Sequence, residues 1–157
     1  MELRRAGRGD IDVIVWFVDA MLQDMASYGG HPLVEARRRD RLLRAHVDAC
    51  LADADHLFLL AVPAGEVPEP LGLAEASVTG LDHLLQPKRV LHIHALYVEP
   101  GHRRHGIGQA LLEAALAWGK ERGCREAALN VLTGNPASHL YQATGFQAFQ
   151  VEMRRRL

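Results

Sequence analysis

The stretch from residue 89 to residue 118 constrains the fold of this chain more than any other. The run 89–98 is rich in β-branched and aliphatic residues, and the run 111–118 is apolar at helical spacing. Between them lies a tight turn with Arg103, Arg104, Gly106 and Gly108. The first N–H groups of a helix are unpaired and the helix dipole favours an anion there, while glycine lets a phosphate approach the backbone. The sequence therefore predicts a strand, a turn that binds a diphosphate, and a helix.

The remaining elements follow from apolar periodicity and from turn residues. We expect strands over 2–5, 56–62, 71–78, 89–98, 125–132 and 146–154. Helices are expected from Asp10 to a breaker at 28–32, and over 34–51, 106–122 and 135–144. The turn at 63–70 makes its two flanking strands an antiparallel hairpin. The order β-α-α-β-β-β-α-β-α-β predicts an α+β fold, with a mixed, mostly antiparallel central sheet flanked by helices.

Composition limits the class of protein and its partners. The chain has 157 residues, 48% of them hydrophobic, which predicts one domain over 1–157 with a packed core. Its net charge of −1 favours neither nucleic acid nor a membrane as a partner. The N-terminus lacks a signal-peptide core, and no apolar run approaches the ~20 residues of a membrane span. We expect a cytoplasmic protein in which Cys50 and Cys124 are free thiols.

Three kinds of phosphate-binding loop compete for the turn. A Walker loop requires Gly-Lys-Ser/Thr at its end, whereas Gly108 is followed by Gln109 and an alanine. A dinucleotide fingerprint requires a third glycine at position 111, which is Leu111. The third kind has a basic residue, two spacer residues, then Gly-x-Gly. Residues 103–108 match it in full.

Two motifs together carry a resemblance to a known family. The pattern Val98-x-Pro-x-x-Arg103-x-x-Gly106-Ile-Gly108-x-x-Leu-Leu resembles the acetyl-CoA-binding motif of the GNAT superfamily of N-acetyltransferases. A second stretch, Asn135-Pro-Ala-Ser-x-Leu-Tyr141-x-x-x-Gly-Phe, resembles the next motif of that family. The resemblance covers about residues 90–146, and the element order outside that span agrees. It implies the GNAT fold and acetyl-CoA as co-substrate.

The resemblance also implies where acetyl-CoA binds. The pyrophosphate would lie on the N–H groups of residues 104–108, with Arg103 adding charge. The pantetheine arm would pair with the edge of the strand around 96–98, which in the family diverges from the following parallel strand. The cofactor-binding residues expected on this basis are Leu96, Tyr97, Val98, Arg103, Arg104, His105, Gly106, Ile107, Gly108, Gln109, Asn135, Ser138 and Tyr141. Asn135 also suits the start of a helix as its N-cap.

The expected reaction is direct attack of a primary amine on acetyl-CoA within a ternary complex. By the resemblance, Tyr141 is the candidate acid for the departing thiolate. His92 and His94 point to one face of their strand and are candidate bases, since histidine titrates near neutral pH. Family members that acetylate histones have a Glu at about position 92, so this chain departs from that pattern. Glu75 is a further candidate base. For each of these four candidates, Tyr141, His92, His94 and Glu75, the alternative is a role in packing or at the surface.

Several points are left open by the sequence. The amine belongs to a small molecule or a peptide, and loops 27–33 and 81–88 are candidate walls of its site. No metal is expected, because His92 and His94, with His83 or His102, lack a Cys, Asp or Glu at ligand spacing. A CoA-binding sensor or subunit without turnover is the alternative function, and a longer acyl group is not excluded. The segment 147–154 could pair with a second copy as a homodimer.

Overall fold

A computed structural model describes residues 1–65, 69–80 and 89–155 of the chain. The described residues form the strands β1 (Glu2–Arg5), β2 (His56–Val62), β3 (Gly72–Gly80), β4 (Arg89–Val98) and β5 (Glu126–Leu129). The α-helices are α1 (Ile11–Ser27), α2 (Ala36–Leu51), α3 (Ile107–Glu121) and α4 (Ala137–Ala143). Short 3-10 turns, η1 (Arg8–Asp10) and η2 (Pro100–His102), precede α1 and α3.

The described strands form one mixed sheet in the order β1-β2-β3-β4-β5. The pairs β1–β2, β2–β3 and β3–β4 are antiparallel, and β4–β5 is parallel. The helix α3 connects the parallel pair, as the strand–helix–strand pattern of the sequence predicted. The predicted α+β class with a mostly antiparallel sheet is therefore confirmed.

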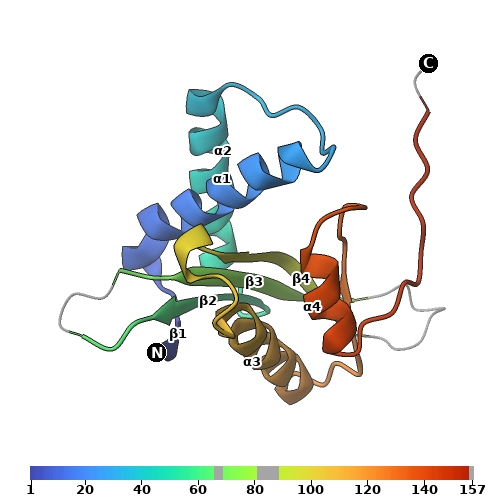
Figure 1. The fold of residues 1–157 in the computed structure, drawn as a ribbon. Helices are drawn as coiled ribbons and strands as arrows, with labels where there is room; N and C mark the ends of the chain where they lie inside the picture. The colour runs from blue at the N-terminus through green and yellow to red at the C-terminus, as the bar shows by residue number, and fades with distance from the viewer. Residues whose placement is uncertain (66–68, 81–88, 156–157) are drawn as a thin grey trace.

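Two layers of helix cover the two faces of the sheet (Figure 1). Helices α1 and α2 pack on one face, where Phe17, Val47, Phe58 and Leu60 are buried. Helix α3 packs on the other face through a second cluster of buried residues, against which side chains of α4 also pack. Alternate residues of β2 point to opposite faces, as the pleat of a strand requires. Both faces of the central strands are thus removed from water.

The predicted last strand, over 146–154, is wrong for the isolated chain. Described residues 146–155 form no regular element, and Figure 1 shows the segment running away from α4. An extended segment needs a partner edge to form a ladder, and none of the described strands pairs with it. Strand β5 (Glu126–Leu129) is also shorter than the predicted 125–132, because its pairing with β4 ends at Leu129.

None of the helices in the described part of the chain has the length and apolar composition needed to cross a membrane.

Candidate acetyl-transfer site

A bulge in β4 opens the sheet. Ala76 pairs with Ile93 and Glu75 pairs with Ala95, so His94 is the extra residue on β4. A bulge bends its strand and reverses the alternation of side chains beyond it. Strand β5 follows β4 only to the pair Ile93–Leu129, and beyond that point β4 continues to Val98 without β5 beside it. This divergence, which the family resemblance implied, ends β5 early and frees one edge of β4.

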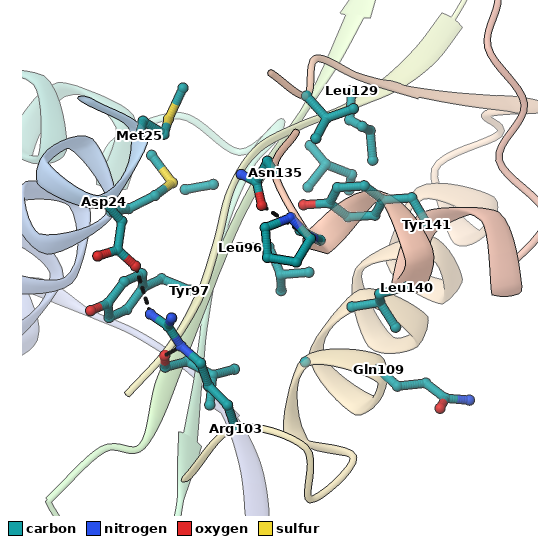
Figure 2. A pocket seen from close by; sticks show the side chains of 18 of the residues that line it. Asp24, Met25, Leu96, Tyr97, Arg103, Gln109, Leu129, Asn135, Leu140 and Tyr141 are labelled. Carbon is teal, nitrogen blue, oxygen red and sulfur yellow. Dashed lines mark hydrogen bonds and ion pairs between the residues drawn. The ribbon is translucent and has the colours of Figure 1, made fainter. Parts of the chain in front are cut away.

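A cavity of about 740 Å³ lies at this divergence. One wall is the free part of β4, and the opposite wall comes from the loop after β5 and from α4. The turn before α3 closes one end, and the last turns of α1 close another (Figure 2). Ten of the predicted cofactor residues line the cavity: Leu96, Tyr97, Val98, Arg103, Arg104, Gly106, Gly108, Gln109, Asn135 and Tyr141.

The turn before α3 has the backbone that an anion site needs. Arg104 has φ +64° and Gly106, the residue that precedes the first turn of α3, has φ +80°. Left-handed positions of this kind are typical of turns whose successive N–H groups bind an anion, and α3 begins directly after them at Ile107. A Cβ on Gly108 would meet Leu140 and Val98 only at ordinary contact distances of 3.4 and 3.6 Å. The packing of the protein therefore tolerates a side chain at 108, and the space that glycine leaves is on the cavity side.

Arg103 has partners other than the backbone of the turn. Its guanidinium donates to the Asp24 carboxylate at 2.7 Å and to the Val98 carbonyl at 2.8 Å, and it lies 5.2 Å from the centroid of the Tyr97 ring. The dashed lines in Figure 2 mark these hydrogen bonds. Arg103 therefore joins the end of α1 to β4, and its charge is shared with Asp24.

Three predicted cofactor residues lie outside the cavity lining. Ile107 is buried against Leu111 in the core beneath the turn. His105 is exposed, with its Nδ1 3.3 Å from the His102 carbonyl. Ser138 lies in the first turn of α4, where its N–H donates to the Asn135 carbonyl. For Ile107 the expected contribution is a backbone N–H, which burial of the side chain leaves in place.

Helix α4 directs Tyr141 into the cavity. The Asn135 side chain accepts a hydrogen bond from the Ala137 N–H at 2.9 Å. The N-cap position of α4, predicted for Asn135, is occupied by Pro136, so Asn135 lies one residue before it and holds the turn that leads into the helix. The Tyr141 ring packs edge-on against Phe146 at 6.0 Å, and Figure 2 shows its hydroxyl directed toward Asn135. Burial raises the pKa of Tyr141 above the ordinary tyrosine value. The hydroxyl therefore keeps its proton at neutral pH, as an acid must.

The two histidines of β4 lie on one face of the strand, as predicted, with ring centroids 4.8 Å apart. That face is the one covered by α1 and α2. His94 lines the cavity, and its Nε2 is 2.7 Å from the Ser77 hydroxyl. Burial lowers the pKa of His94 below the ordinary histidine value, against the opposing charge of Glu75. The imidazole is neutral at pH 7, which is the form that accepts a proton. His92 is half-buried and outside the cavity lining.

Glu75 lies behind these histidines and does not line the cavity. Its side chain is buried, and its Oε1 is 2.9 Å from His56 Nε2 and 3.1 Å from His46 Nε2. Burial by itself raises the pKa of Glu75, but the hydrogen bonds from His56 and His46 outweigh it and lower the pKa. The alternation along β3 was compatible with a solvent-facing Glu75. The helix α2, packed over this face, is what encloses it.

Sequence reasoning missed two groups of residues near the site. Met21, Asp24 and Met25 of α1 line the cavity, although only the loop 27–33 was expected there. His46, Cys50 and His56 gather around Glu75 from α2 and β2. Tyr28 does fall in the expected loop, whereas the loop 81–88 and His83 lie outside the described residues. The four-residue spacing of His46 and Cys50 was the one available signal, because it puts both side chains on one side of a helix.

Comparisons with known proteins identify the family. Residues 18–146 match the model of the acetyltransferase (GNAT) family. An aminoglycoside N(6')-acetyltransferase type 1 of Salmonella typhimurium is 34% identical over 112 residues, which are 64% of this chain and 73% of that protein. The corresponding enzyme of Klebsiella aerogenes is 38% identical over 91 residues, 57% of this chain and 58% of that protein.

The structural comparison agrees. The crystal structure of a GCN5-related N-acetyltransferase from Ralstonia eutropha JMP134 superposes with a TM-score of 0.80 and 28% identity, over 99% of this chain and 97% of that one. The two motifs that carried the resemblance, at 98–112 and 135–146, border the cavity at the divergence of β4 and β5. The chain therefore belongs to the GNAT family of acetyl-CoA-dependent N-acetyltransferases.

Proposed function

We propose that the acceptor is a primary amine of a small polycationic molecule of the aminoglycoside class. Six relatives that carry the name aminoglycoside N(6')-acetyltransferase support this class. The observation that carries the proposal is that one cavity has both His94 and Tyr141 in its lining, a neutral base and a protonated acid. Asp24, which shares its carboxylate with Arg103, adds a polar group at the α1 end of the same cavity.

Acetyl-CoA is held, in this proposal, mainly by backbone groups. The N–H groups from Arg104 to Gly108 bind the pyrophosphate, and the free edge of β4 from Leu96 to Val98 pairs with the amides of pantetheine. The ion pair of Arg103 with Asp24 supports this turn from the side of α1. The side chains of Gln109 and Asn135 supply further polar contacts along the cavity.

His94 takes the proton that the amine must lose. An alkylammonium with a pKa near ~10.4 is mostly protonated at pH 7, and only the neutral amine is a nucleophile. His94 accepts one proton from the ammonium, and Ser77 holds the imidazole in place. As the new C–N bond forms and the C–S bond of the thioester breaks, Tyr141 supplies a proton to the sulfur. The amine's second proton leaves to water, from which Tyr141 is reprotonated.

His92 and Glu75 support the base rather than replace it. Glu75 is only 3% exposed and does not line the cavity. Its negative charge favours a proton on His94. His92 lies against His94 and limits the rotation of that ring.

The experiment is thiol release from acetyl-CoA across a panel of amines. Aminoglycosides with a 6'-amine should release CoA thiol faster than polyamines, amino acids or peptides, and an aminoglycoside with a 6'-hydroxyl is the matched control. Release with peptides alone would overturn the substrate class. Tight CoA binding by calorimetry with release on no amine would favour the alternative, a CoA-binding sensor or subunit. Propionyl-CoA in the same assay measures the tolerance for a longer acyl group.

The C-terminal segment supports a homodimer. Its apolar residues alternate, and Phe149, Val151 and Met153 are 98%, 81% and 91% exposed. In the described chain β5 pairs on one edge only, with β4. An unpaired edge and an extended, half-apolar segment of the same sequence suit strand addition between two copies. Sedimentation should give a dimer for the wild type and for Gln150→Lys, and a monomer for Phe149→Lys/Val151→Lys. A monomeric wild type at all concentrations would overturn this proposal.

Three predictions from composition are also part of what we propose. They are a single domain over 1–157, a cytoplasmic location, and no nucleic acid or membrane as a partner. The near-balanced charge of the chain supports the last of them.

A further inference from the structure

A group of metal-ligand side chains lies between α2 and the sheet, beside the acetyl-transfer site. His46 and Cys50 are one turn apart on α2, and Glu75 reaches them from β3. One ligand atom from each, an imidazole nitrogen, the thiol sulfur and a carboxylate oxygen, all lie within 4.8 Å of one another. The acetyl-transfer reaction proposed above uses neither His46 nor Cys50.

We propose that His46, Cys50 and Glu75 form a binding site for a zinc-type divalent ion. Metal bonds of about 2.0–2.3 Å in a tetrahedron separate the ligand atoms by roughly 3.3–3.7 Å. The distances here are 3.1 Å from His46 Nε2 to Glu75 Oε1 and 3.6 Å from His46 Nε2 to Cys50 Sγ. The third pair, Cys50 Sγ and a Glu75 carboxylate oxygen, lies within 4.8 Å. Rotation of these two side chains must therefore bring their ligand atoms up to about 1 Å closer to surround an ion.

The residues around the three ligands suit a metal site as well. His56 Nε2 lies 2.9 Å from Glu75 Oε1, so the carboxylate is oriented by a neighbour that is itself buried. Partners of this kind orient the ligands of metal sites. The Glu75 side chain is only 4% exposed, so a bound cation would also balance its buried negative charge.

The site has an entrance. The His46 side chain is 52% exposed, whereas Cys50 is partly and Glu75 almost fully covered. An ion can therefore reach the group from solvent along α2, and water can occupy the fourth position of the tetrahedron. Without the ion, burial and then the charge of Glu75 raise the pKa of Cys50, so the thiol keeps its proton. Ion binding releases that proton as the metal–sulfur bond forms.

This site differs from the metal set weighed from the sequence. That set combined His92 and His94 with His83 or His102, and it lacked a thiol or a carboxylate. The tertiary fold instead brings two ligands of α2 to a carboxylate of β3. His46 and Glu75 are 29 residues apart in the sequence.

The test is a titration of the metal-stripped protein with Co²⁺. We expect a single Co²⁺ per chain, with the thiolate-to-metal absorption band and the strong visible bands of a tetrahedral site, and displacement by Zn²⁺. Cys50→Ala should abolish the thiolate band. His46→Ala should weaken Co²⁺ binding by about 100-fold or more, because loss of a residue that only orients a ligand already costs about 10–100-fold. Cys124→Ala, which removes the other thiol, is the matched control and should bind like the wild type.

Thermal unfolding gives a second readout that needs no activity. An ion that joins α2 to β3 stabilises the folded state by mass action, so Zn²⁺ should raise Tm in the wild type and in Cys124→Ala but not in Cys50→Ala. Because Glu75 is buried and its variants risk misfolding, the test rests on the two ligands of α2. Absence of the thiolate band in the wild type, or its persistence in Cys50→Ala, would overturn the site.

Discussion

The two halves of the acetyl-transfer site are built in different ways. The cofactor half, residues 98–112 with 135–146, consists of contiguous motifs in which backbone groups are the expected contacts. The acceptor half collects single side chains from α1, β3 and β4, such as Asp24, Ser77 and His94. A backbone site depends on local conformation, here the left-handed Arg104 and Gly106, which a short motif can specify. A side-chain site depends on which distant segments pack together.

His94→Ala is the largest expected change, and it tests the acceptor half. Loss of a general base costs typically 10²–10⁴-fold in rate, so kcat/KM for the amine should fall by about that factor at pH 7. CoA affinity should stay unchanged, because the cofactor half does not include this side chain.

The pH profile sharpens this test. Since the pKa of His94 is lowered, its ring gains a proton only below the ordinary histidine value near ~6.5, and wild-type activity should fall through that range. The variant should lack this fall, whereas the slope due to the amine's own ionisation should be the same in both proteins. His92→Ala compares the rival base. A larger loss in His92→Ala would exchange the two roles.

Gly108→Asp is the corresponding change in the cofactor half. The new carboxylate occupies the space that glycine leaves on the cavity side and repels the pyrophosphate, so CoA affinity should fall by roughly 100-fold or more, about 3 kcal/mol. The control Gly101→Asp adds the same charge to the exposed η2 turn and should have a much smaller effect. Equal CoA affinity of Gly108→Asp and the wild type in calorimetry would contradict the backbone cradle.

Tyr141→Phe lies where the halves meet. A thiol with a pKa near ~8.5 is a fair leaving group without an acid, so we expect kcat to fall by about tenfold only. The KM for acetyl-CoA should change little, because the ring and its packing on Phe146 remain. An unchanged kcat, measured with chemistry as the slow step, would remove Tyr141 from the acid role.

Asp24→Asn should have the smallest effect. The ion pair with Arg103 is about 40% exposed on both sides, and such pairs contribute ~0–1 kcal/mol. We expect a rise in the amine KM of up to about fivefold, little change in Tm, and unchanged kcat. The control is Asp12→Asn, which lies on α1 like Asp24 and removes a surface ion pair with Arg44 of α2. A larger loss of CoA affinity than of amine affinity would move Asp24 into the cofactor half.

The sequence predicted the sheet strands up to β5 and the helices to within a few residues, because each has a clear apolar period and a definite end. It failed where an element depends on a partner. Residues 146–154 alternate like a strand but pair with none of the described strands. Strand β5 stops at Leu129 because β4 bends away at His94. The burial of Glu75 also had no local signal, since nothing near it in the sequence reveals that α2 covers it.

By itself, the sequence determined the family and the cofactor, because the turn from Arg103 to Gly108 and the Asn135–Tyr141 stretch are contiguous motifs. It also predicts where the cofactor binds, and both motifs border the cavity. The tertiary structure alone decided which histidine faces the cavity, that Asp24 holds Arg103, and that His46 and Cys50 meet Glu75. The reason is physical: the bulge at His94 and the packing of α1 and α2 are set by contacts between residues far apart in the chain. No local pattern carries that information.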